Sequence, residues 1–499
     1  MSLAELLNGA DARPALCDGH ASLSRAELTR RVHELAGALR ASGVRTLAIL
    51  LDNGIDWVVA DLAAASAGLP VIPLPPFFSA AQSLHVLQSA GVDGLIGGSA
   101  ELAEAAGYQA TPGLPGLEAP FYRRAGAPVA VPAGTAKITF TSGTTGTPKG
   151  VCLSAANQLN VARSLVAATA GLGIRRHLCL LPLAVLLENI AGVYAPLLAG
   201  AQTIVPPLAE VGLSGSSGFE VATCLRALHH YQAESVILLP QMLHALIHAL
   251  ELGAPRPQQL RFIAVGGGKV AGSLLARADA LGLPVFEGYG LSECASVVAL
   301  NTPTARRAGS VGKPLPHVEV SVSDGEIRVA GNRFLGYLGE AAASDDGAAL
   351  ATGDLGHVDA DGFLVLDGRR KNLIITAFGR NLSPEWPEAE LTAHPAIAQA
   401  AVFGEARPYC VAVIVPRRSE LSDTELAGAL ASVNARLPDY AQIRTFVRAH
   451  ETFSQHNGLL TANGRVRREA IAARYAAPLA ALYGADEDAT CNAVTEDRA

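Results

Sequence analysis

Residues 138–151, ITFTSGTTGTPKGV, concentrate side chains that suit a bound polyanion. The glycines lack Cβ atoms, so backbone N–H groups can close around phosphate oxygens, while the threonines and the serine add hydroxyl donors. Lys149 supplies the full positive charge. A flexible surface turn is the alternative interpretation, and the length and order of the stretch argue against it. The anion-binding residues expected here are Thr141, Ser142, Gly143, Thr144, Thr145, Gly146 and Lys149.

The loop differs from the phosphate-binding loop of kinases and related NTPases. Gly150 follows Lys149, where those proteins carry a serine or threonine whose hydroxyl coordinates Mg²⁺. An NTPase or kinase is therefore the least favoured nucleotide-using function.

Residues 141–150, TSGTTGTPKG, resemble without a gap the phosphate-loop signature of the acyl-adenylate-forming (AMP-binding) superfamily. Its members include acyl- and aryl-CoA ligases, peptide-synthetase adenylation domains and beetle luciferase. The resemblance implies an AMP-forming acid–thiol ligase: ATP and a carboxylate give acyl-AMP and pyrophosphate, and a thiol then displaces AMP. It implies ATP and Mg²⁺ as cofactors, and CoA or the phosphopantetheine arm of an acyl carrier protein as acceptor.

A second block, EGYGLSE at residues 287–293, follows the loop after about 150 residues. The resemblance implies that the tyrosine stacks on adenine, the serine contacts the α-phosphate and Glu293 helps to bind Mg²⁺, a hard cation that prefers oxygen ligands. By itself, YGLSE would predict only a turn followed by a helix cap. The nucleotide-binding residues expected in this block are Gly288, Tyr289, Gly290 and Ser292.

Two further blocks lie close together in the sequence, at residues 352–356 and 367–372. In TGDLG, Asp354 resembles the family's ribose-binding aspartate, since a carboxylate can accept from both ribose hydroxyls. An Asx-turn between two strands is the alternative. In DGRRKN, the resemblance makes Arg369 a second ribose contact and Lys371 the hinge between two domains.

The block TAFGRNLSPEWPE, residues 376–388, resembles the loop that enters the active site for thioester formation. Its glycine, Gly379, is expected to line the pantetheine tunnel. A loop capped by Ser383, with Pro384 at the start of a helix, is the structural alternative, and both can hold.

The last block departs from the family pattern. Family members usually carry a lysine in a segment like NGK, and that lysine contacts the carboxylate and the α-phosphate during adenylation. This chain reads NGR, with Arg465 at that position. A guanidinium keeps the charge but differs from an ammonium in plane and reach. Arg467 and Arg468 either take part or form a solvated basic face.

The segment PLAVLLEN, residues 182–189, resembles PLAHxxER of long-chain acyl-CoA synthetases. Glu188 is retained, whereas Val185 and Asn189 replace the usual histidine and arginine. Few charged residues are visible around the expected acid pocket, which disfavours an amino acid whose ammonium needs an acidic partner. A fatty or otherwise lipophilic acid is therefore favoured, with an aryl acid as the alternative. The resemblance lines the acyl pocket with Val185, Leu239, Val265, Gly266, Gly267 and Val298.

Composition excludes other classes of function. At 499 residues the chain is expected to form two or more domains, and 50% hydrophobic residues supply large cores. A net charge of -7 gives no basic field for nucleic acid. Seven scattered cysteines, without metal-ligand spacing, and no signal peptide favour a reducing cytoplasm. The apolar stretch 178–201 contains two prolines and a glutamate, which favours a buried strand, loop and helix over a membrane span.

Alternating helical and strand patterns predict an α/β protein with parallel sheets, whose ligands lie beyond the carboxyl ends of strands. Shorter alternating runs between residues 303 and 367 predict antiparallel hairpins. With the resemblance, the expected fold is a large N-terminal domain, residues 1–370, of two αβ subdomains plus a distorted antiparallel β-barrel-like part. A small mobile α+β domain, residues 371–484, and a disordered acidic tail, residues 485–499, complete it.

A rival from another class is a non-catalytic acyl- or nucleotide-binding protein on the same scaffold, which Arg465 makes credible. A luciferase-like oxygenase shares the motifs as well. The partners expected are a small carboxylic acid and, if the acceptor is not free CoA, an acyl carrier protein.

Overall fold

The computed structural model describes residues 3–7, 12–125, 129–141, 149–215, 218–340, 348–378, 380–461 and 464–483. The chain forms two compact units, which we describe separately. Unit 1 is Met1–Gly267, Ala278–Thr352 and Val358–Val365; unit 2 is Gly268–Arg277, Gly353–His357 and Leu366–Ala499. The boundaries expected at residues 370 and 484 stay predictions, and the tail 485–499 lies outside the described residues.

Unit 1 contains an eight-stranded sheet. Its central strands β5, β3, β4 and β8 run parallel, and antiparallel strands extend both edges. In spatial order the strands are β21 (Gly336–Tyr337), β9 (Lys149–Ser154), β8 (Thr135–Thr141), β4 (Val71–Pro73), β3 (Leu47–Leu50), β5 (Gly94–Gly97), β7 (Phe121–Arg123) and β6 (Gln109–Ala110).

A nine-stranded sheet forms the other half of unit 1. Its strands from β16 to β1 run parallel, and three antiparallel strands complete the edges. In spatial order they are β18 (Lys313–Pro314), β17 (Ser296–Leu300), β16 (Val285–Leu291), β15 (Phe262–Val265), β14 (Ser235–Leu238), β10 (Arg176–Leu178), β11 (Gln202–Ile204), β1 (Pro14–Cys17) and β2 (Ser22–Ser24).

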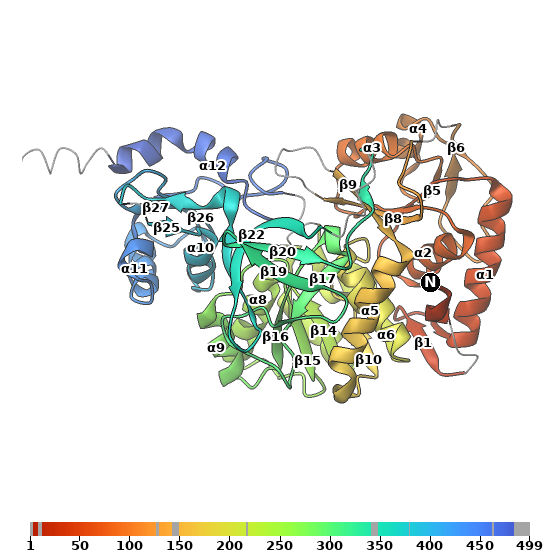
Figure 1. The fold of residues 1–499 in the computed structure, drawn as a ribbon, viewed down its shortest axis with the longest axis horizontal. Helices are drawn as coiled ribbons and strands as arrows, with labels where there is room; N and C mark the ends of the chain where they lie inside the picture. Colours follow the sequence, from red (N-terminus) through yellow and green to blue (C-terminus); the bar gives the residue numbers. More distant parts are fainter. Residues whose placement is uncertain are drawn as a thin grey trace, which may run out of the picture. The chain divides into compact units, whose positions relative to one another are not determined.

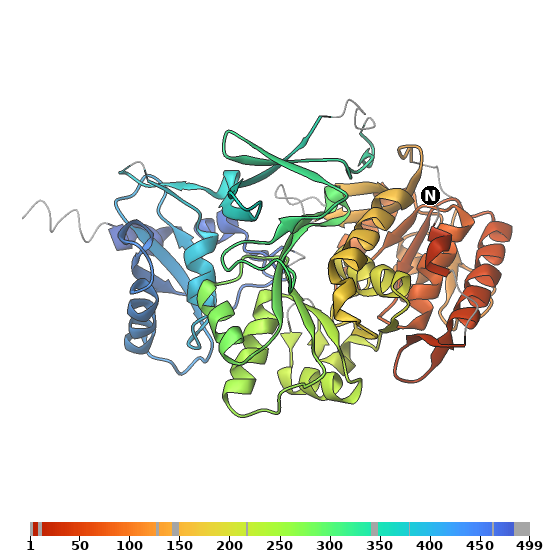
Figure 2. The same cartoon turned by 60° about the horizontal axis from the view of Figure 1, so that its bottom comes forward.

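Helices lie between these sheets and share one hydrophobic core with both of them; α5 lies between the two sheets in Figure 1 and Figure 2. Ser24 caps the first of these helices through a capping box with Glu27. The helices of this layer are α1 (Arg25–Ser42), α2 (Ile55–Ala67), α5 (Ala155–Thr169) and α6 (Ala195–Leu198).

A separate hydrophobic cluster joins α3 (Ala80–Ser89) and α4 (Ala100–Ala105) to the eight-stranded sheet. Further helices follow the strands of the nine-stranded sheet. They are α7 (Val221–His230) and α8 (Pro240–Glu251). The chain between β15 and β16 forms α9 (Gly272–Ala280), whose residues up to Arg277 belong to unit 2. Short 3₁₀ helices are η1 (Leu3–Leu7), η2 (Ala170–Leu172), η4 (Leu208–Val211) and η5 (Ser292–Cys294).

The predicted antiparallel hairpins are present. β19 (Glu319–Ser323) pairs with β20 (Glu326–Ala330), and the sheet continues with β22 (Leu350–Val358) and β23 (Leu364–Arg369). A smaller hairpin joins β12 (Leu213–Ser214) to β13 (Gly218–Phe219). The described strands do not close into a barrel, so the barrel-like part is an open sheet here.

Unit 2 is a small α+β body. A hairpin joins β26 (Ile397–Phe403) to β27 (Cys410–Pro416), and β28 (Ile443–Arg448) pairs with β27 in parallel. Around it, as Figure 1 shows, lie α10 (Glu385–Thr392), α11 (Asp423–Asn434) and α12 (Arg468–Arg474). Short elements complete it: β24 (Ile374–Ile375), β25 (Asn381–Leu382), η6 (Arg370–Asn372) and η7 (Asp439–Ala441).

The predicted cap of α10 is wrong. Pro384 is the N-cap residue and makes no side-chain cap bond. The Ser383 hydroxyl instead donates to the Glu385 carboxylate at 2.8 Å. Serine side chains often make such local hydrogen bonds in place of a cap.

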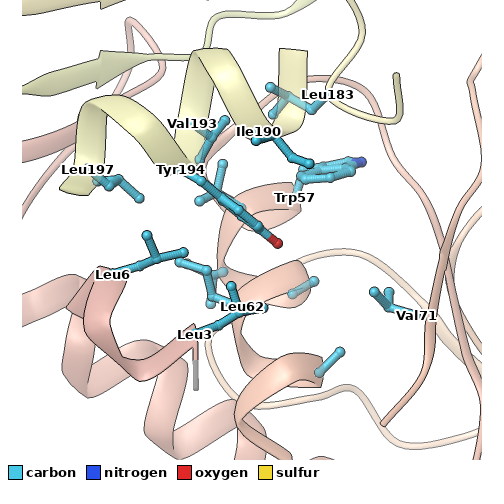
Figure 3. Packing of buried hydrophobic residues seen from close by; sticks show 14 of the residues in the cluster. Leu3, Leu6, Trp57, Leu62, Val71, Leu183, Ile190, Val193, Tyr194 and Leu197 are labelled. Carbon is cyan, nitrogen blue, oxygen red and sulfur yellow. The ribbon is translucent and has the colours of Figure 1, made fainter. Parts of the chain in front are cut away.

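The apolar stretch 178–201 belongs to unit 1 and is largely buried, with only Ala199 and Gly200 exposed. It contains a loop, the π-helix η3 (Glu188–Tyr194) and α6, and Figure 3 shows Ile190, Val193 and Tyr194 of η3 packed against α2 and the N-terminal segment. None of the helices that the structure describes combines the length and the apolar composition that a membrane crossing requires.

Candidate active site

The anion-binding loop connects two antiparallel strands. β8 ends at Thr141 and β9 begins at Lys149, and these two residues are register partners. A strand–loop–strand connection differs from the strand–loop–helix of Walker-type NTPases, which places a helix N-terminus on the phosphates. Five expected contacts, Ser142, Gly143, Thr144, Thr145 and Gly146, lie outside the described residues, and only the backbone of Thr141 is described.

Lys149 stands where the chain re-enters the sheet, and its side chain is 52% exposed. Its Nζ lies 3.3 Å from Oε1 of Glu340 and 4.9 Å from the centre of the Tyr337 ring. The sequence analysis identified neither partner. Since an exposed ion pair of this kind contributes little free energy, Lys149 can exchange Glu340 for a phosphate.

Glu293 lies in η5, directly after β16. Its Oε1 accepts a hydrogen bond of 3.0 Å from the Tyr337 hydroxyl. The carboxylate has a second oxygen, and a single carboxylate together with nucleotide phosphates is a usual ligand set for Mg²⁺. The carboxylate of Glu293 therefore fits Mg²⁺, the metal that the resemblance implies.

A strained turn presents Glu293. Ala295 has φ 57° and Ser296 has φ 99°, a region that residues with side chains rarely adopt. The turn is tight because β16 and β17 pack closely: a Cβ added to Gly290 would lie 1.7 Å from the Ser296 carbonyl oxygen. YGLSE is therefore the end of a strand followed by a 3₁₀ turn, and the predicted helix cap is wrong: this turn has no side-chain cap.

Gly290→Ala is expected to lower the free energy of unfolding by about 1–3 kcal/mol, because backbone atoms must shift to admit the methyl group. Thermal unfolding of the full chain measures it. Gly37→Ala is the matched control: Gly37 lies in α1 with open space around its Cβ position, so this change is expected to stabilise by about 0.5–1 kcal/mol. Equal effects of the two changes would contradict the steric explanation.

Other predicted site residues gather at the carboxyl ends of β14, β15 and β16. A Cβ on Gly266 would lie 3.2 Å from the Gly288 carbonyl oxygen, and one on Gly267 would lie 3.1 Å from Leu239. Tyr289 lies within β16, and its side chain is buried. The structure thus brings part of the expected acid pocket next to the expected adenine contact, at the edge where ligands of such sheets bind.

The remaining expected pocket residues are apolar as well. Val265 and Val298 are buried in β15 and β17, and Val185 is half-buried in the turn that leads into η3. Ser292 begins η5, one residue before Glu293.

Glu188 belongs to a buried polar network. Its Oε1 lies 3.3 Å from Nε2 of His177, and Nδ1 of the same ring lies 2.8 Å from the Ser235 hydroxyl. Cys179 completes a set of donor atoms, all within 4.8 Å, that by type could hold a metal ion. Burial, followed by Glu188, raises the pKa of the Cys179 thiol, so these groups are better occupied with one another than with a cation.

A second buried network lies beside it. Nζ of Lys137 in β8 is 2.8 Å from Asp61 of α2, and both side chains are 1% exposed. The hydroxyl of Tyr194 donates to Asp61 at 2.6 Å, and the Asn189 amide donates to the same carboxylate at 3.1 Å. The network ties the strand that precedes the anion-binding loop to η3.

The two residues expected at the ribose, Asp354 and Arg369, both lie in unit 2. Nε of Arg369 lies 2.7 Å from Oδ1 of Asp354, which is 8% exposed. Asp354 lies within the strand β22, so the alternative of an Asx-turn between strands is wrong. The ion pair fixes the carboxylate, so it can accept from a diol in one orientation.

Arg465 and Lys371 lie near each other within unit 2. The pKa of Lys371 is lowered by burial first and then by the positive charges of Arg369 and Arg465. Arg465 closes a tight turn, since its N–H donates to the Thr461 hydroxyl at 3.0 Å. The predicted thioester-loop residue Gly379 lies outside the described residues.

Arg468 does not belong to a solvated face. Its guanidinium pairs with Glu388 and donates to the Val402 carbonyl at 3.2 Å. Burial raises the pKa of the Glu388 carboxyl to about 7 although Arg468 opposes the shift. Arg467 is exposed and donates to the Gly458 carbonyl at 3.2 Å.

The model of the AMP-binding enzyme family matches residues 5–338, and the model of the AMP-binding enzyme C-terminal domain matches residues 371–487. The chain is 34% identical over 249 residues to the long-chain-fatty-acid–CoA ligase FadD15 of Mycobacterium bovis. That match spans 44% of this chain and 42% of the relative, so it covers about two fifths of the relative's length.

A longer match joins the chain to the 2-succinylbenzoate–CoA ligase of Bacillus subtilis. The two are 30% identical over 437 residues, 79% of this chain and 82% of the relative. The solved structure of o-succinylbenzoate CoA synthetase (MenE) from Bacillus subtilis with the acyl-adenylate intermediate OSB-AMP has a TM-score of 0.74 at 26% identity, covering 94% and 96% of the chains. The structure with ATP and magnesium ion has a TM-score of 0.73 at 27% identity, covering 94% and 98%.

Proposed function

The chain belongs to the AMP-binding enzyme family, and we propose that it activates a carboxylic acid with ATP as acyl-AMP and transfers the acyl group to a thiol. One observation carries this proposal most directly. Lys149, at the end of the anion-binding loop, and Glu293, the expected metal ligand, both contact Tyr337. A lysine that could bind phosphate and a carboxylate that could bind Mg²⁺ thus lie together at the end of the loop. A nucleoside triphosphate would need both groups there.

The first half-reaction needs no covalent nucleophile from the protein. An oxygen of the substrate carboxylate attacks the α-phosphorus, and the bond to the bridging oxygen breaks so that pyrophosphate leaves with the electron pair. Glu293 would hold Mg²⁺, which neutralises charge on the phosphate oxygens. Lys149 would bind phosphate oxygens and stabilise the charge that develops on them. The resemblance gives Arg465 contacts with the carboxylate and the α-phosphate during the same step.

The second half-reaction replaces AMP. The thiol sulfur attacks the acyl carbon, the bond from that carbon to the phosphate oxygen breaks, AMP leaves, and the thiol proton passes to solvent. The similarity to CoA ligases supports CoA as the acceptor. The phosphopantetheine arm of an acyl carrier protein carries the same sulfhydryl and is the second candidate.

A lipophilic acid is the substrate class that we favour. The expected pocket residues that lie at the ends of β14 to β17 are leucine, valine and glycine, and none of them is charged. FadD15 acts on long-chain fatty acids by its name. An aryl acid is the second candidate, because 2-succinylbenzoate–CoA ligases match over a longer part of the chain.

A panel of acids tests the proposal. The full chain is mixed with ATP, Mg²⁺ and straight-chain fatty acids of several lengths, 2-succinylbenzoate, benzoate or an amino acid, and pyrophosphate is measured. We expect release with at least one fatty or aryl acid and none with the amino acid. Addition of CoA or of a phosphopantetheinylated carrier protein then identifies the acceptor by the thioester formed. No release with any acid, together with tight ATP binding, would instead support the non-catalytic binding protein.

The predicted reducing, cytoplasmic setting remains part of this proposal. The six cysteines within the described residues are free thiols, five of them buried.

A further inference from the structure

Tyr337 contacts both charged groups of the candidate phosphate site. Its hydroxyl donates to Oε1 of Glu293 at 3.0 Å, and the Lys149 ammonium lies 4.9 Å from the centre of its ring. One side chain therefore touches the expected metal ligand through its polar end and the expected phosphate cation through its ring.

The fold holds Tyr337 from two sides. It belongs to β21, where it is the register partner of Val151 in β9, and Phe334 packs against its ring edge-to-face with centroids 4.8 Å apart. The backbone N–H of Phe334 donates at 2.7 Å to the carbonyl of Glu293. Residues 334–337 are thus hydrogen-bonded both to the strand that carries Lys149 and to the turn that carries Glu293.

The geometry of the hydroxyl suits a donor to Glu293, since it lies 3.0 Å from Oε1 of that carboxylate. A donor on one carboxylate oxygen fixes the plane of the carboxylate and directs the other oxygen, as the outer partners of metal ligands commonly do.

We propose that Tyr337 is a positioning residue that orients Glu293 toward Mg²⁺ and couples this ligand to Lys149 on the phosphates. The proposal rests on the proposed function, because it assigns the metal of the ATP-dependent step to Glu293. It explains why a half-buried aromatic residue stands at the edge of the sheet beside the loop.

Tyr337→Phe tests the hydroxyl alone, since the ring keeps its contacts with Lys149 and Phe334. A hydrogen bond to a charged group is lost, so the Mg²⁺ concentration that half-saturates ATP binding is expected to rise about tenfold. Titration calorimetry of the full chain with ATP at several Mg²⁺ concentrations measures it, and the Mg²⁺ dependence of pyrophosphate release provides a second readout. The KM for the acid is expected to stay unchanged, and Mn²⁺, which binds carboxylates more tightly, should reduce the defect.

Tyr440→Phe is the matched control, because Tyr440 is an exposed tyrosine of unit 2; it should leave the Mg²⁺ dependence as in the parent chain. Tyr337→Leu removes the ring as well and should add a loss of ATP affinity at saturating Mg²⁺. An unchanged Mg²⁺ midpoint in a folded Tyr337→Phe protein would overturn the proposal. A parent chain that binds ATP with Mg²⁺ but releases no pyrophosphate would refute the proposed function and leave this inference to be decided by the calorimetry.

Discussion

Arg465→Ala is expected to slow acyl-AMP formation by roughly 10²–10³-fold, the usual loss when one donor that stabilises transition-state charge is removed. By the resemblance, Arg465 is expected at the position of the family's adenylating lysine, and it lies on the tight turn that Thr461 closes. Its charge also contributes to lowering the pKa of Lys371. A single-turnover assay of pyrophosphate release, with the acid found in the panel, measures the first half-reaction.

Two matched variants sharpen this test. Arg467→Ala removes an exposed arginine two residues away that donates to the Gly458 carbonyl. It should change the rate less than about threefold if Arg465, and not Arg467, stabilises the reacting groups. Arg465→Lys restores the family residue and should keep or raise the rate. Thioester formation from chemically prepared acyl-AMP should survive Arg465→Ala, because the arginine acts in the first step only. Equal losses in both half-reactions would show that the change damages the fold or the second step.

If the parent chain binds ATP without turnover and Arg465→Lys creates turnover, the non-catalytic interpretation holds. In that case the arginine is the residue that separates this chain from active relatives. The same set of variants therefore distinguishes the two classes of function.

Lys137→Met is expected to lower the free energy of unfolding of unit 1 by about 3–5 kcal/mol. The change leaves Asp61 as an uncompensated buried charge, because the Lys137–Asp61 pair is 1% exposed on both sides. Burial lowers the pKa of Lys137 and the attraction of Asp61 opposes that shift. Each of the two charges is therefore stable in the core only beside the other. Trp57, fully buried and 6.0 Å from the ammonium, reports locally.

The chain has two tryptophans, and Trp386 lies in unit 2, so a Trp386→Phe background isolates the fluorescence of Trp57 during denaturant unfolding. Lys313→Met is the control at an exposed lysine and should cost less than about 0.5 kcal/mol. Adding Asp61→Asn to Lys137→Met should recover part of the loss, because the buried carboxylate then carries no charge. A loss of less than 1 kcal/mol in the single variant would contradict the assigned role of the pair.

The network around Lys137 joins two parts of the site that are distant in sequence. Lys137 precedes the anion-binding loop by a few residues of β8, and Asn189 and Tyr194 belong to η3, which follows the segment expected to border the acid. π-Helical turns occur often at functional sites, since the wider turn redirects side chains. Any loss of ATP or acid affinity in folded Lys137→Met would therefore report on how η3 and β8 are held together.

The residue pattern by itself predicted the parallel strands, the anion-binding loop and the family. Continuous apolar runs between helical patterns identified the parallel strands, since such strands are buried on both faces. The spacing of Gly, Ser, Thr and Lys identified the loop between β8 and β9, and the family matches bear out the resemblance. Local chemistry carries this information: caps, turns and phosphate loops depend on residues that are close together in the chain.

Tertiary structure alone decided the partners of the charged groups. Tyr337 lies 44 residues from Glu293, Glu340 lies 191 residues from Lys149, and Asn189 lies 128 residues from Asp61. Nothing in the sequence specifies such pairs, because they form only when separate strands and helices pack against one another. The same packing made YGLSE a strained turn at the end of a strand, where the local pattern predicted a helix cap. The sequence thus identified candidate groups for the chemistry, and the packing of β9, β21 and η5 decided which of them lie in contact.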